Sequence, residues 1–133
     1  MNQAPHAPIS GHVEEIATVV LDSAFAVHRA LGPGLIESVY ETCLCHELSK
    51  RRVAFQRQLT LPVLYDGVRL DAGLRIDLLV ADEVIVELKA VERMISLFEA
   101  QLLTYLRLTG KRLGLLINFN VEMLKDGITR RVL

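Results

Sequence analysis

A chain of 133 residues with 51% apolar and 23% charged side chains has the size and composition of one soluble globular domain. Its formal net charge of −1 argues against strong unaided binding to nucleic acid, because sequence-independent binders usually carry a large excess of positive charge. The first 49 residues hold six acids against one arginine, so the rest of the chain is net basic and local basic clusters stay available.

The chain begins with ten residues that contain two Ala-Pro pairs and little to bury. We expect a flexible tail over residues 1–10, followed by a single domain over residues 11–133. Ser10 can cap a helix, and apolar residues then recur at helical spacing from Val13 to Leu31. The Gly-Pro-Gly segment at 32–34 ends this helix, and a second helix is predicted over about 36–51.

The periodicity of apolar residues changes to two after the second helix. Residues 58–65 and 68–80 are predicted to form a hairpin around an Asp-Gly turn, with an interruption near 71–73. Residues 84–90 are almost continuously apolar, which is typical of a central strand covered on both faces. A helix over 96–109, a strand over 112–118 and an edge strand over 128–132 follow.

The predicted order of elements is α-α-β-β-β-α-β-β, without internal repeats or a linker that would divide the chain. Three consecutive strands, a crossover helix and a further strand favour a mixed central sheet of four to five strands flanked by helices. The fold class is therefore α/β, in the sense of a mixed α+β domain.

The cysteines and the apolar segments help to predict the cellular compartment of the protein. Cys43 and Cys45 lie two apart in a predicted helix, so their side chains diverge and cannot pair. The first ten residues lack a basic region followed by an apolar run, and the apolar stretch 113–121 is too short to span a bilayer. We expect a cytoplasmic protein without a membrane segment.

Charged residues interrupt the two segments whose apolar pattern most clearly predicts a buried strand, residues 74–80 and 84–90. Alternation places Arg75, Asp77 and Leu79 on one face of the first strand. Glu87 and Lys89 share one face of the second strand. Burying a charge is costly unless it is paired or binds a metal, so an ion pair between the lysine and either acid is one explanation.

A divalent-metal site is the other explanation for these residues. Hard cations such as Mg²⁺ and Mn²⁺ prefer carboxylate and carbonyl oxygens. Asp77, Glu87 and the Leu88 carbonyl would supply three such ligands from neighbouring strands. The ion would polarise a phosphoryl oxygen, while Lys89 would hold the attacking water or steady the charge that develops on the phosphate.

Gly34, Glu37 and Tyr40 follow the spacing Gly-x-x-Glu-x-x-Tyr. This motif resembles the signature of the GxxExxY proteins, a branch of the PD-(D/E)xK nuclease superfamily, and the similarity covers residues 13–133. The segments GPGLIESVYE, VIVELKAVE, EAQLLTYLRLTG and LGLLINFNV carry it. The resemblance implies a restriction-endonuclease-like core and nuclease activity with Mg²⁺ or Mn²⁺. One departure is Ile76, which stands where the superfamily motif often has proline.

The resemblance also assigns roles to individual residues. Asp77 and Glu87 correspond to the metal-binding acids of the superfamily, and Lys89 corresponds to its catalytic lysine. Glu37 corresponds to a helical glutamate that joins the metal site in related nucleases. A first-turn glutamate favoured by the helix dipole is the structural alternative for Glu37.

Four further residues have both a functional and a structural interpretation. Gln101-x-x-x-Tyr105 resembles a QxxxY helix motif found beside the active site, and the spacing puts both side chains on one helical face. They would contact substrate or support the lysine, or they would only cap the core. Tyr40 either supports the site or is a buried ring with a satisfied hydroxyl. Arg75 either pairs with an acid or touches a phosphate.

These patterns support three functions. Metal-dependent hydrolysis of phosphodiester bonds in DNA or RNA uses all of the residues above. A catalytically silent module that binds nucleic acid or a protein is suggested by the small size and the near-neutral charge. A structural or assembly role would leave Lys89 in an internal ion pair. A homodimer would help a domain of this size to span a duplex.

Overall fold

The computed structural model describes residues 7–133, so residues 1–6 of the expected tail lie outside the described residues. Helix α1 (Gly11–Leu31) begins after Ser10, whose hydroxyl accepts a hydrogen bond from the Val13 N–H at 3.2 Å, as the sequence predicts. The helix ends at Gly32, whose φ of 67° lies in the left-handed region that favours glycine.

The remaining elements follow the predicted order. Strand β1 begins three residues earlier than the expected residue 58, while the other boundaries agree within a residue or two. The elements are α2 (Glu37–Lys50), β1 (Phe55–Tyr65), β2 (Val68–Val80), β3 (Val84–Lys89), α3 (Ser96–Thr109), β4 (Leu113–Asn118), the short 3-10 helix η1 (Leu124–Gly127) and β5 (Ile128–Val132).

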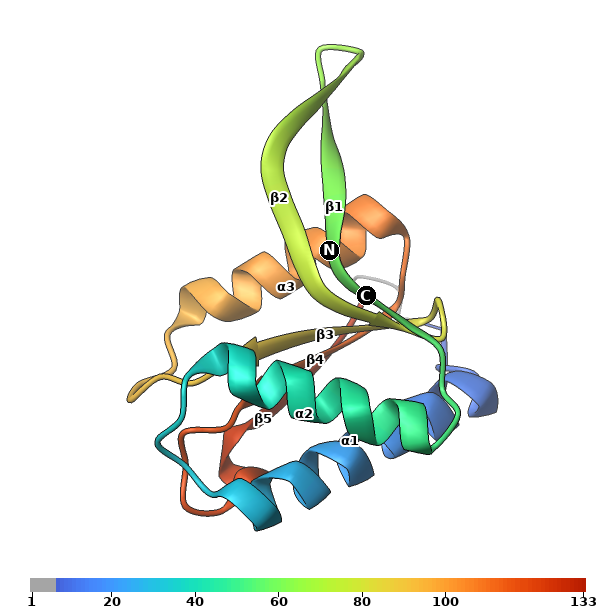
Figure 1. Cartoon of the computed structure of the whole chain (residues 1–133). Coiled ribbons are helices and arrows are strands. Elements are labelled where there is room, and N and C mark those ends of the chain that lie inside the picture. Colours follow the sequence, from blue (N-terminus) through green and yellow to red (C-terminus); the bar gives the residue numbers. More distant parts are fainter. Residues whose placement is uncertain (1–6) are drawn as a thin grey trace.

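The five strands form one mixed sheet in the order β1-β2-β3-β4-β5. Strands β3 and β4 are parallel, and the other neighbours are antiparallel. Helices α1 and α2 lie on one face of the sheet, and α3 lies on the other (Figure 1). This arrangement confirms the predicted mixed α+β architecture and is consistent with a restriction-endonuclease-like fold.

The apolar side chains form two cores, one on each face of the sheet. The larger core lies between the sheet and the helix pair α1 and α2. The smaller core joins α3 to the sheet and to the base of the β1–β2 hairpin. Gly114 lets α3 approach closely, because a Cβ atom at this position would lie 2.7 Å from Leu102 Cδ1. The smaller core consists of Leu61, Ile76, Leu79, Ile85, Leu102, Leu106 and Leu116.

The β1–β2 hairpin rises away from the rest of the sheet (Figure 1). Its register shifts where Leu61 and Val63 face Leu74 and Leu70, so β2 carries two extra residues there. Gly73, with a φ of 76°, lies inside this bulge, which confirms the interruption predicted near 71–73. Strand β1 forms an edge of the sheet and contains a proline between the two shifted pairs.

The side chain of Arg112 ties together segments from both ends of the described chain. It donates hydrogen bonds to the carbonyls of Ala7 at 2.6 Å, Pro8 at 3.2 Å and Leu133 at 3.0 Å. The segment before α1 is thereby attached to the β4–β5 side of the sheet. Within residues 7–133, no helix combines the length and the apolar character needed to cross a membrane.

Candidate functional site

The β2–β3 ladder stops at the two acids that the sequence singles out. Its last regular pair is Leu78 with Val86, which is the third pair counted from the β2–β3 turn. Beyond it, the Asp77 N–H donates to Glu87 Oε1 at 2.9 Å, and the Leu88 N–H donates to Asp77 Oδ2 at 2.8 Å. Each carboxylate therefore satisfies a backbone donor of the opposite strand, at the place where the strands separate.

Strand β2 bends as it leaves β3, and this bend changes which residues share a face. Ile76 and Leu79 both pack in the smaller core, whereas Leu78 packs in the larger one. The predicted unbroken alternation of Arg75, Asp77 and Leu79 is therefore wrong between positions 76 and 79. Arg75 is exposed on the projecting part of the hairpin.

The acids in this region disfavour one another's charge. Glu87 is only 8% exposed, and its burial, with the nearby Asp77 second, raises its pKa to about 8. Burial is also the main cause of the raised pKa of Asp77. Glu37 is the most exposed of the three, yet partial burial of its carboxyl and then the charge of Asp77 raise its pKa. A cation placed among these groups would relieve this penalty.

Lys89 lies two residues beyond Glu87 on β3 and points to α3. Its ammonium nitrogen lies 4.3 Å from the centroid of the Phe98 ring, which is a cation–π contact. Within residues 7–133, Lys89 forms no ion pair with Asp77 or Glu87. The internal ion pair considered from the sequence is therefore absent. Sequence reasoning missed Phe98, although it lies on α3 one turn before the QxxxY residues.

Tyr40 is buried and holds the loop that precedes α2. Its hydroxyl donates to the Gly32 carbonyl at 2.6 Å and accepts from the Leu35 N–H at 3.2 Å. Its ring stacks on Phe119, with centroids 4.6 Å apart and an interplanar angle of 10°. Of its two interpretations, the structure shows the second, a buried ring with a satisfied hydroxyl, and a side chain with no exposed area is out of reach of a substrate.

Gly34 and Glu37 owe their positions to the same loop. Gly34 has a φ of 101°, which a residue with a Cβ rarely adopts, and its N–H donates to Asn120 Oδ1 at 3.1 Å. Glu37 is the first residue of α2, near enough to Asp77 for that charge to influence its pKa. The Gly-x-x-Glu-x-x-Tyr motif thus consists of a loop residue, an acid and a buried support.

Tyr105 and Gln101 differ in their relation to the acids. Tyr105 is half-buried at the edge of the smaller core, and burial followed by the charges of Glu87 and Asp77 raises its pKa. Gln101 is exposed and forms no side-chain hydrogen bond within residues 7–133. Tyr105 is therefore the member of the QxxxY pair that lies near the acids.

The family model described as the PD-(D/E)XK nuclease superfamily matches residues 14–132. The chain belongs to this superfamily. No curated protein and no solved structure gives a significant match. The split between β2 and β3 is where this domain brings the side chains of Asp77 and Glu87 together.

Two residues of this nuclease domain that sequence reasoning missed lie beside Asp77. Glu41 is 7% exposed, and its carboxylate accepts hydrogen bonds from Arg57 at 2.9 Å and from Gln58 at 2.7 Å. Gln58 Nε2 also lies 3.4 Å from Asp77 Oδ1. The available signal was the position of Glu41 one turn after Glu37, which places both acids on the same side of α2.

The donor atoms of the nuclease domain suit a hard divalent cation. Two carboxylates and the Leu88 carbonyl are oxygen ligands of the kind that Mg²⁺ and Mn²⁺ prefer. Within residues 7–133, no three His, Cys, Asp or Glu side chains converge as ligands of one ion. Here the Asp77 and Glu87 carboxylates engage backbone N–H groups, so they would have to share these oxygens with an ion.

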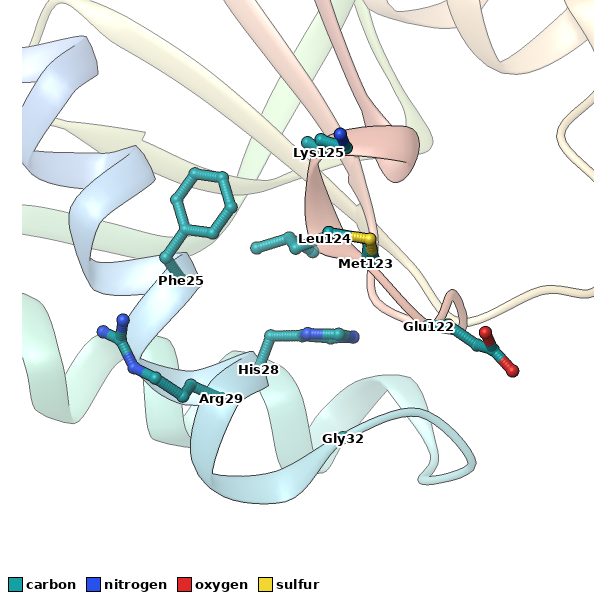
Figure 2. Close-up of a pocket in the computed structure, with 8 residues that line it drawn as sticks. All are labelled: Phe25, His28, Arg29, Gly32, Glu122, Met123, Leu124 and Lys125. Carbon is teal, nitrogen blue, oxygen red and sulfur yellow. The ribbon is translucent and has the colours of Figure 1, made fainter.

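A separate pocket of about 570 Å³ opens between the end of α1 and η1 (Figure 2). Its inner wall is apolar, and the His28 ring beside it donates from Nε2 to the Val121 carbonyl at 2.7 Å. None of the acids discussed above lines this pocket, so it is separate from the region around Asp77 and Glu87. Its lining residues are Phe25, His28, Arg29, Gly32, Glu122, Met123, Leu124 and Lys125.

Proposed function

We propose that this chain hydrolyses phosphodiester bonds of DNA or RNA with the help of Mg²⁺ or Mn²⁺. The observation that carries the proposal is the placement of Asp77 and Glu87 in the split between β2 and β3, with Lys89 at the next alternate position. Membership of the nuclease superfamily supports it, because these nucleases usually use divalent metals and act on nucleic acids.

The metal ligands in this proposal are Asp77, Glu87 and the Leu88 carbonyl. Glu37, which does not converge with these two acids in the structure, would approach the ion from α2 when it binds. The raised pKa values of the three acids support this assignment, because each carboxylate would gain from a neighbouring cation. The bound ion would supply the positive charge that polarises a phosphoryl oxygen and lowers the pKa of a coordinated water.

The remaining residues bind and orient the substrate in this proposal. Lys89 donates hydrogen bonds to the attacking water or to the phosphate oxygens, because its ammonium is not engaged by either acid. Tyr105 and the exposed Gln101 present polar groups from α3. Arg75 contacts a backbone phosphate from the exposed hairpin.

We further propose that the chain belongs to the GxxExxY branch of the superfamily. The left-handed Gly34, the first-turn Glu37 and the buried Tyr40 support this assignment, because each position has a physical reason for its residue.

The direct test uses purified full-length protein with single-stranded DNA, duplex DNA and RNA, each with Mg²⁺, Mn²⁺ or a chelator. We expect cleavage that requires the metal and is lost in Asp77→Ala and Lys89→Ala. Asp22→Ala and Lys125→Ala are the matched controls, because both side chains are exposed and form no ion pair within the described residues.

Unchanged cleavage in both site variants would exclude this site. Salt-sensitive binding without cleavage under any metal would instead identify the chain as a silent binding module on the nuclease fold, in keeping with its near-neutral charge.

A further inference from the structure

Gln58 on β1 has a backbone conformation that side chains rarely adopt. Its φ of 50° lies in the left-handed region, although it is neither a glycine nor a turn residue. Its two neighbours on β1 pair with the two neighbours of Asp77 on β2, so Gln58 stands opposite Asp77. Such conformations persist only where the surroundings enforce them, and they cluster at functional sites.

The side chain of Gln58 joins two acids that come from different elements. Its Nε2 donates to Glu41 Oε1 on α2 at 2.7 Å and lies 3.4 Å from Asp77 Oδ1 on β2. A primary amide has two N–H groups, so it can serve both carboxylates without adding a charge. Arg57 donates to the other oxygen of Glu41 at 2.9 Å and fixes that acid in turn.

These contacts engage both oxygens of Asp77. Oδ1 faces the Gln58 amide, and Oδ2 accepts from the Leu88 N–H at 2.8 Å on β3. The plane of the carboxylate is therefore set by β1 on one side and by β3 on the other. Loss of the Gln58 contact would leave only the Leu88 N–H to hold the carboxylate, which would then be less restricted in its rotation about the Cβ–Cγ bond.

We propose that Gln58 is a positioning residue that holds Asp77 in the orientation needed for metal binding, with Glu41 as its anchor. This inference rests on the function proposed above. It assigns Gln58 to the second layer of contacts around the ion, where loss of a hydrogen-bond partner typically weakens metal affinity about 10- to 100-fold.

A backbone role alone would explain the left-handed conformation without any effect on the metal. Gln58→Gly separates the two roles, because glycine adopts a φ of 50° without strain but has no amide to donate. Gln58→Leu keeps the bulk of the side chain and removes only its hydrogen bonds. Gln56→Leu is the matched control, because Gln56 lies on the same strand, is exposed and forms no side-chain hydrogen bond within residues 7–133.

The experiment is a titration of the full chain with Mn²⁺ alone. Binding is detected by calorimetry or by the paramagnetic resonance signal of the free ion. We expect Gln58→Gly and Gln58→Leu to bind Mn²⁺ about 10- to 100-fold more weakly than the unchanged protein. Gln58→Gly should be at least as resistant to thermal unfolding as the unchanged protein, and Gln56→Leu should bind normally. Mn²⁺ affinity unchanged in Gln58→Gly would overturn the inference.

Asp77→Ala distinguishes the failure of this inference from the failure of the proposed function. If Asp77→Ala abolishes Mn²⁺ binding while both Gln58 variants bind normally, only the positioning role is overturned. If the unchanged protein does not bind Mn²⁺, or Asp77→Ala binds it equally well, the proposed metal site and the inference are both overturned.

Discussion

The contact between Lys89 and Phe98 fixes where the Lys89 ammonium lies. With its nitrogen 4.3 Å from the ring centroid, Lys89 is held towards α3 and kept apart from the two acids. If Lys89 formed an ion pair with Asp77 or Glu87, its ammonium would compete with a metal cation for that carboxylate. Phe98 therefore limits the rotamers of Lys89 without adding a charge of its own.

Phe98→Leu tests this contact, because leucine keeps an apolar side chain and removes the face of the ring. We expect kcat to fall by about five-fold, since a cation–π contact contributes about 1 kcal/mol. Cleavage kinetics with saturating metal would measure the change. Leu97→Ala, at a neighbouring exposed position, should leave kcat unaltered, and an unaltered kcat in Phe98→Leu would show that the ring does not position Lys89.

Glu87 makes the stability of the metal-free protein depend on pH. Its pKa is about 8 in the folded chain against an ordinary value of 4.5, so between these values the folded state holds a proton that the unfolded state has released. The contribution of Glu87 to stability should therefore be fully present below about pH 4.5. It should be lost as the pH rises to 8, by on the order of 5 kcal/mol, because each unit of pKa difference corresponds to about 1.4 kcal/mol.

Urea unfolding in a chelator at pH 5 and pH 8.5 would measure this loss. Glu87→Gln should show a shallower dependence, because its amide oxygen can still accept from the Asp77 N–H while carrying no charge. An identical dependence in both proteins would contradict the role given to Glu87.

At the residue scale, the alternation of side chains along a strand was predictable for the candidate site. Glu87 and Lys89 stand two apart in an apolar run, so their shared face could be read directly. Gln58 could not be found in this way. Counting back from the Asp66–Gly67 turn pairs it with Arg75, and only the two extra residues in the β2 bulge move Asp77 opposite it.

Among the elements, the loop before α2 depends on one hydroxyl. Tyr40→Phe would keep the stacking on Phe119 but would remove the hydrogen bonds to Gly32 and Leu35. We expect a loss of about 1–2 kcal/mol in the free energy of unfolding, because the Gly32 carbonyl is left without this donor. Chemical denaturation would measure it, and Tyr65→Phe at the exposed hairpin tip should change nothing.

The junction between η1 and β5 depends on a close backbone approach. A Cβ atom on Gly127 would lie 2.1 Å from the Asn118 carbonyl oxygen on β4, and a backbone atom cannot move aside as a side chain can. We expect Gly127→Ala to destabilise the fold by about 3 kcal/mol. Gly11→Ala, which meets nothing within 4 Å, should be neutral. Equal stability of the two variants would refute this explanation.

Element types were predictable because their periodicities were long and clear. The helix over Ser96–Thr109 and the buried strand β3 follow directly from the spacing of their apolar residues. The start of β1 was missed because Gln56, Arg57 and Gln58 give no alternation. The bend of β2 lies at Asp77, where hydrogen bonds to Glu87 and Leu88 on β3 replace the regular ladder, and local sequence does not contain these contacts.

For the molecule as a whole, Arg112 connects the segment before α1 with the last strand. Arg112→Ala would remove three hydrogen bonds to carbonyl groups of Ala7, Pro8 and Leu133. We expect a loss of about 1–2 kcal/mol in the free energy of unfolding. Urea unfolding and faster amide exchange at both ends would report it, with Arg93→Ala as the exposed control.

The order of the elements was enough to predict the layers of the molecule, since consecutive strands tend to be neighbours and a crossover helix must cover one face. The projection of the hairpin was not predicted. It follows from the short β2–β3 ladder of three pairs, because most of β2 has no partner strand on that side among the described residues.

The proline on the outer strand has a consequence for how copies of this chain meet in solution. Within residues 7–133, the outer edge of strand β1 is unpaired and ends in the apolar side chains of Leu64 and Tyr65. A second molecule could add its own strand to such an edge. Pro62 lacks an N–H, and the adjoining bulge twists the edge, so a continuous intermolecular ladder cannot form there. Pro62 and the bulge thus disfavour fibril formation through the edge of the β1–β2 hairpin.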